Sequence, residues 1–334
     1  PETMSDLEVI EAGVAALYSG DGERAAELFQ LTGVRTDDQI RAEAAYQAAI
    51  GGRLTLSCTE GRSTPGAFNC TAPYQNAATD AIGFVGRENI DVVVEDGVIT
   101  EFGVFPEITP FNFPVHSWML IQFGVFLATE GRLEGYEDCE IVPFPESCAT
   151  IQMENLDGWV EWRENMDGTK VVEAALNSWY GGDCPRARWL SGLLFDCSTS
   201  SVPTQTIEYE SKLGAQVSVD CEAPPYKGTL SCEVQYSSAM NRAVGEPPSV
   251  TVREFIVDDE SPFVNDARQD LSPWYGGIYP EDTELRESFR LFAEGGDLQD
   301  EYADANCASE RTPECANLIL DNLDEWAAWY ETNR

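Results

Sequence analysis

The feature that most constrains this chain is an internal repeat, because one pattern occurs twice at an offset of 162 residues. Residues 9–21 read VIEAGVAALYSGD, and residues 171–183 read VVEAALNSWYGGD. In both copies the apolar residues have the spacing of an amphipathic helix, and a glycine follows that would end it. A chain built this way is expected to fold as two similar units rather than around one continuous core.

The remainder of each copy follows the same order of patterns. Two further helical segments come next, and the apolar period then changes from 3.6 to 2, which marks a switch to β-sheet. A hairpin is predicted over 54–74, with a second over 90–104, and residues 217–236 match the first. The match to the second hairpin is residues 252–257 with a tight turn at Asp258-Asp259. Helices close each copy.

This order predicts an α+β fold in two domains, residues 1–166 and 167–334, joined by a short polar link. The closing helices share a Leu-Asp-x-Trp sequence at 156–159 and 323–326. Tryptophans recur at the spacing of helical faces, so most of them are interpreted as core residues.

The ten cysteines are expected to form five local disulfides. Two pairs lie on the apolar faces of the predicted hairpins, and two more occupy equivalent positions before the closing helices. The remaining two cysteines pair by elimination. The predicted bridges are Cys58–Cys70, Cys139–Cys148, Cys184–Cys197, Cys221–Cys232 and Cys307–Cys315.

Composition narrows the class of protein. With 59 acidic and 20 basic residues the formal charge is −39, which disfavours binding to nucleic acid or to anionic membranes. No apolar run reaches the roughly 18 residues of a membrane span, so no membrane insertion of the mature chain is expected. Paired cysteines indicate an oxidising compartment. We therefore expect an exported bacterial protein, extracellular, periplasmic or on the cell surface, with its signal peptide removed.

Three N-terminal helices, a Tyr-x-Gly-Asp turn after the first, and a curved antiparallel sheet resemble the NTF2-like superfamily, especially its SnoaL-like members. The resemblance covers both halves and implies two tandem cone folds, each with extra C-terminal helices stapled by disulfides. It also implies that Tyr18, Asp21, Tyr180 and Asp183 belong to the scaffold, since these residues end the first helix and turn the chain in that family.

Enzymes of that superfamily, such as ketosteroid isomerase, limonene epoxide hydrolase and polyketide cyclases, hold a carboxylate deep in the cone. Most of the acidic and basic residues nearest to such positions here are interpreted as surface residues. Asp91 and Arg253 are expected on the convex face of the sheet, away from the cone. The other members of this set are Glu95, Asp96, Glu101, Glu254, Asp258 and Asp259.

The candidate ligand contacts are aromatic residues near the expected mouth of each cone. His116, the single histidine, opens an apolar helix and is the only imidazole available for acid–base chemistry. Neither a metal site nor a cofactor is predicted, because acidic clusters such as Asp258-Asp259-Glu260 lack the spacing of a calcium-binding loop. The candidates are His116, Trp118, Phe111, Phe113, Trp274 and Tyr275.

Three functions remain open at the level of sequence. The favoured one is non-catalytic binding of a small apolar or aromatic molecule, or of a protein partner. The second is a SnoaL-like enzyme, an isomerase, cyclase or epoxide hydrolase, that uses a buried carboxylate in one domain. The third is a structural or assembly protein of the cell surface. An ionisable group in an open cavity would distinguish the second from the first.

Overall fold

A computed structural model describes most of the chain, and contacts between Cα atoms divide it into two compact units. The first comprises residues 1–126 and 133–166, and the second comprises 127–132 and 167–334. The described residues are 4–31, 35–61, 66–106, 115–137, 139, 144–191, 197, 201–222, 229–257, 265–266, 283–308 and 310–334. Of these, the side chains of 104–106, 115–117, 265–266 and 283 are not described.

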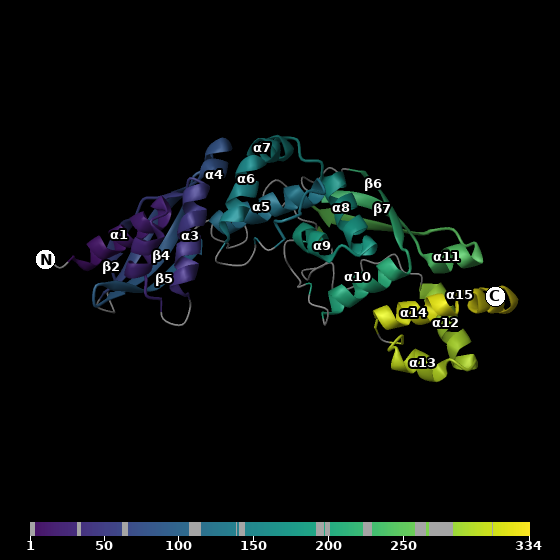
Figure 1. Cartoon of the computed structure of the whole chain (residues 1–334). Helices are drawn as coiled ribbons and strands as arrows, with labels where there is room; N and C mark the ends of the chain where they lie inside the picture. Colours follow the sequence, from purple (N-terminus) through teal and green to yellow (C-terminus); the bar gives the residue numbers. More distant parts are fainter. Residues whose placement is uncertain are drawn as a thin grey trace. The chain divides into compact units, whose positions relative to one another are not determined.

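The first unit begins with three helices whose starts are set by capping side chains (Figure 1). The caps Ser5, Asp21 and Thr36 accept a hydrogen bond from a backbone N–H in the first turn of the helix that each precedes. Such caps satisfy donors that a helix end leaves without a partner. The three helices are α1 (Asp6–Ser19), α2 (Gly22–Leu28) and α3 (Asp37–Ala49).

The Tyr-x-Gly-Asp turns act as expected for scaffold. Gly20 ends α1 with a φ of 83°, and Gly182 ends the first helix of the second unit with a φ of 86°. This left-handed conformation favours glycine. The aspartate that follows each glycine then caps the next helix, Asp21 toward Arg24 N and Asp183 toward Arg186 N. Each Gly-Asp pair therefore ends one helix and begins another.

A curled antiparallel sheet follows the three helices. Its central strand β3 pairs with β4 along its length, and β1 and β2 pair with different ends of its other edge. The β4–β5 turn places Asp96 and Gly97 at positive φ, as a tight hairpin requires. The strands are β1 (Arg53–Leu54), β2 (Ser57–Glu60), β3 (Ala67–Gln75), β4 (Gly86–Glu95) and β5 (Val98–Pro106), with the short helix α4 (Ala77–Ala81) after β3.

The core of the first unit lies between the three helices and one face of this sheet. Alternate residues of β4, among them Ile90 and Val92, pack against the apolar stripe of α1 that contains Ile10, Val14 and Leu17. Three further helices follow: α5 (Val115–Thr129), which belongs to the first unit up to Phe126, α6 (Glu146–Glu154) and α7 (Leu156–Glu164). Trp159 of α7 is fully buried and stacks on Phe123 of α5, with ring centroids 4.8 Å apart.

The second unit has a closely similar order of elements: three helices, then an antiparallel sheet in the order β6-β7-β8-β9, then closing helices. Its helices are α8 (Gly168–Gly181), α9 (Cys184–Leu190), α10 (Val202–Lys212), α11 (Ala239–Val244), α12 (Thr283–Gly295), α13 (Gln299–Asp304), α14 (Pro313–Asp321) and α15 (Leu323–Asn333). Its strands are β6 (Gln216–Glu222), β7 (Thr229–Ser237), β8 (Ser249–Ile256) and β9 (Asn265–Asp266).

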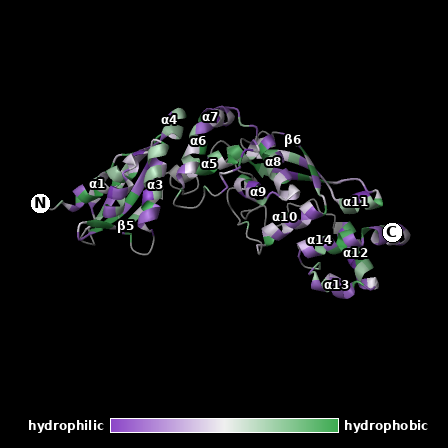
Figure 2. Cartoon of the chain, in the orientation of Figure 1, coloured by the Kyte–Doolittle hydropathy of each residue, from purple (hydrophilic) through white to green (hydrophobic). Residues whose placement is uncertain are grey.

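A core cluster in the second unit joins α10 and α11 to the closing helices. Phe289 of α12 and Trp326 of α15 are fully buried in it, and Trp326 Nε1 donates to Ser288 Oγ at 3.2 Å. In Figure 2 the helices carry both hydrophilic and hydrophobic residues, as expected for elements with one exposed and one buried face. The closing helices are therefore part of the folded core and not appendages.

Five disulfides join the pairs predicted from the sequence, and each spans 8 to 13 residues. Cys58 faces Cys70 directly across the β2–β3 ladder, and Cys221 faces Cys232 across β6–β7. The cross-strand prediction is thus confirmed at both hairpins. The five bridges are consistent with folding in an oxidising compartment.

Two details of the second sheet differ from the sequence-based predictions. The β8–β9 register pairs Ile256 with Asn265, so the connection is longer than a two-residue turn at Asp258-Asp259. Arg253 does not lie on the convex face, because it is two residues before the fully buried Phe255 and strand residues two apart share a face. The prediction for Arg253 miscounted this alternation.

Candidate functional site

Of the six predicted ligand contacts, only Trp118 has a described side chain. It is buried near the start of α5, where its ring lies 5.5 Å from Phe84 and below the Arg163 guanidinium. His116 lies in the first turn of α5, but its side chain is outside the described residues. So are Phe111, Phe113, Trp274 and Tyr275. Trp118 therefore packs against protein side chains in the interior of the first unit.

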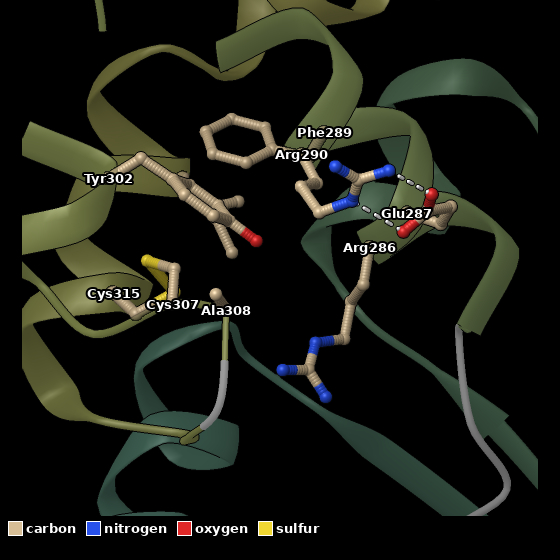
Figure 3. A pocket seen from close by; sticks show the side chains of 9 residues that line it. Arg286, Glu287, Phe289, Arg290, Tyr302, Cys307, Ala308 and Cys315 are labelled. Atoms are coloured by element: carbon tan, nitrogen blue, oxygen red, sulfur yellow. Dashed lines mark hydrogen bonds and ion pairs between the residues drawn. A yellow bond between two sulfur atoms is a disulfide. The ribbon is translucent and has the colours of Figure 1, made fainter. Parts of the chain in front are cut away.

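A pocket of about 220 Å³ lies among the closing helices of the second unit (Figure 3). Helices α12, α13 and α14 supply its walls, and none of its residues is among the predicted ligand contacts. The lining residues are Arg286, Glu287, Phe289, Arg290, Tyr302, Cys307, Ala308, Cys315 and Ile319.

Local structure explains how these side chains come together. Arg286, Phe289 and Arg290 are three and four residues apart on α12, a spacing that puts them on one helical face. Thr312 caps α14 by accepting from Cys315 N, and the Cys307–Cys315 disulfide fixes the end of the α13 segment to α14. The disulfide thus holds two walls of the pocket at a set separation.

The two arginines of the pocket differ in their partners. Arg290 is bound by Glu287 and Glu294, so its charge is largely neutralised. Its guanidinium lowers the pKa of Glu287, which makes that carboxylate a weak base. Arg286 forms no ion pair with any described residue, although its guanidinium lies 5.6 Å from the centre of the Tyr209 ring. Figure 3 shows its side chain running away from the Arg290–Glu287 pair.

Tyr302 contributes a hydroxyl group to the wall of the pocket. Its side chain is largely buried, and its hydroxyl points into the pocket (Figure 3). Burial raises the pKa of Tyr302, while the charges of Arg286 and Arg290 act in the opposite direction. The phenol therefore carries its proton at neutral pH and can donate a hydrogen bond.

The interior of the first unit holds a second group of polar residues, which are joined by a series of hydrogen bonds that ends at Glu43. Asn76 donates to the Tyr74 hydroxyl at 3.1 Å, and Tyr74 donates to Gln47 Oε1 at 3.3 Å. Gln47 in turn donates to Glu43 Oε1 at 2.9 Å. The other oxygen of Glu43 is buried and has no hydrogen-bond partner among the described residues. This series of hydrogen bonds thus ends at the Glu43 carboxylate, whose Oε2 atom accepts none from the described residues.

A further carboxylate, Glu88 of β4, is fully buried on the inner face of the same sheet. Burial raises the pKa of Tyr18, and the charges of Glu88 and Glu43 add to that effect. The two carboxylates therefore share an interior with a protonated tyrosine. Neither Glu43 nor Glu88 is among the acidic residues considered from the sequence.

The second unit has a buried carboxylate whose two oxygens are both hydrogen-bonded. Glu210, which follows Tyr209 as Gln47 follows Tyr46, is buried in α10. Tyr236 donates to one of its oxygens at 2.7 Å, and Arg311 donates to the other at 2.8 Å. This carboxylate is held as a paired ion with both oxygens bonded.

Most of the acidic residues predicted to lie at the surface do so. Asp91 is exposed and accepts from Asn69 Nδ2 at 2.6 Å, and Glu95, Asp96 and Glu101 are exposed on or beside the β4–β5 hairpin. Glu254 is partly exposed, while Asp258 and Asp259 lie outside the described residues.

The described residues offer neither a metal-binding cluster nor a membrane-spanning helix. No group of three or more histidine, cysteine or acidic residues is arranged to hold a metal ion in that part of the chain. No described helix has the length and apolarity needed to cross a bilayer. Comparison of the whole chain with known families, curated proteins and solved structures gave no match.

Proposed function

We propose that this is an exported, non-catalytic protein of two tandem NTF2-like domains, whose second domain binds a small, mostly apolar or aromatic molecule. The order of elements in each unit, three helices followed by a curled antiparallel sheet, supports the family assignment. The five local disulfides support export. The observation that carries the binding function is the pocket among α12, α13 and α14.

The size and lining of this pocket favour a small ligand. A cavity of about 150 Å³ lined by apolar residues can hold benzene, so about 220 Å³ accommodates one ring with a short substituent. Phe289, Ile319 and the Cys307–Cys315 bridge supply apolar walls, and a few polar groups converge on the same space. That combination is typical of small-molecule sites.

The ionisable groups of the pocket favour binding over catalysis. Glu287 is a weak base because Arg290 lowers its pKa, and Tyr302 keeps its proton because burial raises its pKa. The arginines do not exchange protons at neutral pH. Among the described lining residues, none is tuned for general acid–base work near neutral pH.

A change at the rim tests the binding function. Ala308 is exposed at the mouth, so Ala308→Trp should block entry without disturbing the core. The matched control is Ala303→Trp, an exposed residue of α13 outside the pocket. With indole and 2-phenylethanol as probes in ligand-detected NMR, wild type and the control should bind saturably and Ala308→Trp should not. No saturable binding to wild type, or equal binding to all three proteins, would overturn the proposal.

A second candidate function is a SnoaL-like enzyme in the first unit, which the buried Glu43 supports. Its Oε2 atom lacks a described hydrogen-bond partner and could accept a proton from a bound substrate. An epoxide and a β,γ-unsaturated ketone serve as probe substrates. Turnover that is lost in Glu43→Gln and kept in the exposed control Glu11→Gln would establish this function in place of the first.

A further inference from the structure

Arg286 stands out because the chain is strongly acidic and yet none of its described carboxylates pairs with this cation. Acidic residues outnumber basic ones by 59 to 20, and nearby Arg290 binds two glutamates. Arg286 makes no hydrogen bond or ion pair with the residues that the structure describes, and it lines the pocket from the same helix. A partly buried guanidinium of this kind is a ready site for an anion.

Tyr302 gives a second, independent indication. Its side chain is only 7% exposed, and its hydroxyl, which points into the pocket in Figure 3, forms no hydrogen bond within the described structure. Because the hydroxyl faces the pocket, a ligand there can accept a hydrogen bond from it.

The first unit differs at the position that matches Arg286. Leu120 precedes Phe123 by three residues, as Arg286 precedes Phe289, so a neutral side chain replaces the cation. Tyr136 lies three residues before Cys139, whereas Tyr302 lies five residues before Cys307, and the Tyr136 hydroxyl donates to Leu120 O and accepts from Gln152. Among the described residues of the first unit, Leu120 and the hydrogen-bonded Tyr136 therefore do not reproduce the pairing of Arg286 with Tyr302.

We propose that the pocket is a site for a small organic carboxylate whose acid group binds Arg286 and the Tyr302 hydroxyl and whose apolar body contacts Phe289 and Ile319. This inference rests on the proposed binding function and names its ligand class. Carboxylate oxygens accept from both a guanidinium and a phenol, and such charge-assisted bonds are stronger than those to neutral acceptors.

The test compares three probes of one shape: phenylacetate, phenylacetamide and 2-phenylethanol. Titration of the full-length wild type should give phenylacetate a Kd about tenfold lower than that of phenylacetamide, since the amide lacks the charge. Arg286→Gln should weaken phenylacetate binding by about 10- to 100-fold and leave phenylacetamide within twofold. Tyr302→Phe should weaken phenylacetate by about fivefold. Arg24→Gln, at an exposed ion pair of the first unit, is the matched control and should change neither.

The outcomes separate this inference from the function on which it rests. Equal affinity of the wild type for acid and amide would overturn the carboxylate site and leave the binding function standing. Binding of none of the probes would overturn both. Should Arg286→Gln fail to fold, Arg286→Lys, which keeps the charge, is expected to retain the preference for the acid. Loss of that preference in a folded Arg286→Lys variant would show that acid binding needs the bidentate guanidinium and not the charge alone. The comparison of probes on wild type needs no variant.

Discussion

Arg311 and Glu210 form a buried ion pair in the second unit, with 2.8 Å between the guanidinium Nη1 and the carboxylate Oε1. Their side chains are 11% and 3% exposed, and Tyr236 donates to the second carboxylate oxygen. The pair connects α10 to the residues just before α14. It therefore ties α10 to the start of α14, one of the three helices that form the pocket.

Removing one member of this pair should lower the free energy of unfolding much more than removing both. Arg311→Met leaves the Glu210 carboxylate buried without its cation, and we expect a loss of about 3–5 kcal/mol in the free energy of unfolding. Adding Glu210→Gln should restore much of that loss, because Gln47 occupies the corresponding position in the first unit and accepts from Tyr74. Urea denaturation of both variants measures this. Additive effects of the two changes would contradict the prediction.

Gly182 should be less replaceable than Gly83, although both have positive φ. At Gly182 a Cβ atom would lie 2.6 Å from Ser211 Oγ, whereas at Gly83 it would meet nothing within 4 Å. Gly83→Ala should cost about 1–2 kcal/mol for the backbone conformation alone. Gly182→Ala should cost more, and thermal melts compare the two. Equal losses would show that Ser211 moves aside freely.

The hairpin bridge Cys58–Cys70 should stabilise the first unit by restricting its unfolded chain. With a sequence separation of 12 between the cysteines, the chain-entropy relation gives about 3 kcal/mol. The double variant Cys58→Ala, Cys70→Ala is expected to lose that amount in urea denaturation. Removal of Cys221–Cys232, which closes a loop of similar length, is the natural comparison and should cost a similar amount. A loss below about 1 kcal/mol in both would contradict the entropic account.

Alkaline pH should destabilise the first unit through its buried tyrosines. Burial raises the pKa of Tyr18, Tyr46, Tyr74 and Tyr136 above the ordinary value near 10. The folded state keeps these protons while the unfolded chain loses them. Their contribution is therefore complete below about pH 10, and stability falls as the pH rises toward the folded-state values. Each such tyrosine adds a slope of about 1.4 kcal/mol per pH unit.

Tyr46→Phe tests this dependence through the slope rather than through stability itself. The substitution also removes the hydrogen bond to Gln152, so the variant should be less stable at every pH. Its stability should nevertheless decline less steeply above pH 10. Urea denaturation at several alkaline pH values, with absorbance at 295 nm to follow tyrosinate, measures both. An unchanged slope would show that Tyr46 is not among the residues responsible.

Features set by neighbouring residues could be predicted from the sequence. The helices of the repeat depend on local spacing and caps, and each disulfide joins cysteines close in the chain. The burial of Glu88 could also be predicted from the sequence, since this residue alternates in phase with the buried Ile90 and Val92. The interpretation of acidic residues as surface residues is appropriate for most of this chain but not for Glu88.

The pocket could not be predicted in the same way. Arg286 and Phe289 share a helical face that periodicity can identify, but Tyr302 and Ile319 meet them only because three helices pack together. Whether the packed side chains leave space depends on volumes that a linear pattern does not specify. The absence of a partner for Arg286 likewise emerges only from the three-dimensional arrangement.

The order of the disulfides has a consequence for biosynthesis. Every cysteine is joined to its immediate neighbour in the series, and no bridge encloses or crosses another. A polypeptide that enters an oxidising compartment amino end first can thus form its native connectivity by oxidising thiols two at a time as they emerge. That route requires no enzyme to reshuffle incorrect pairs.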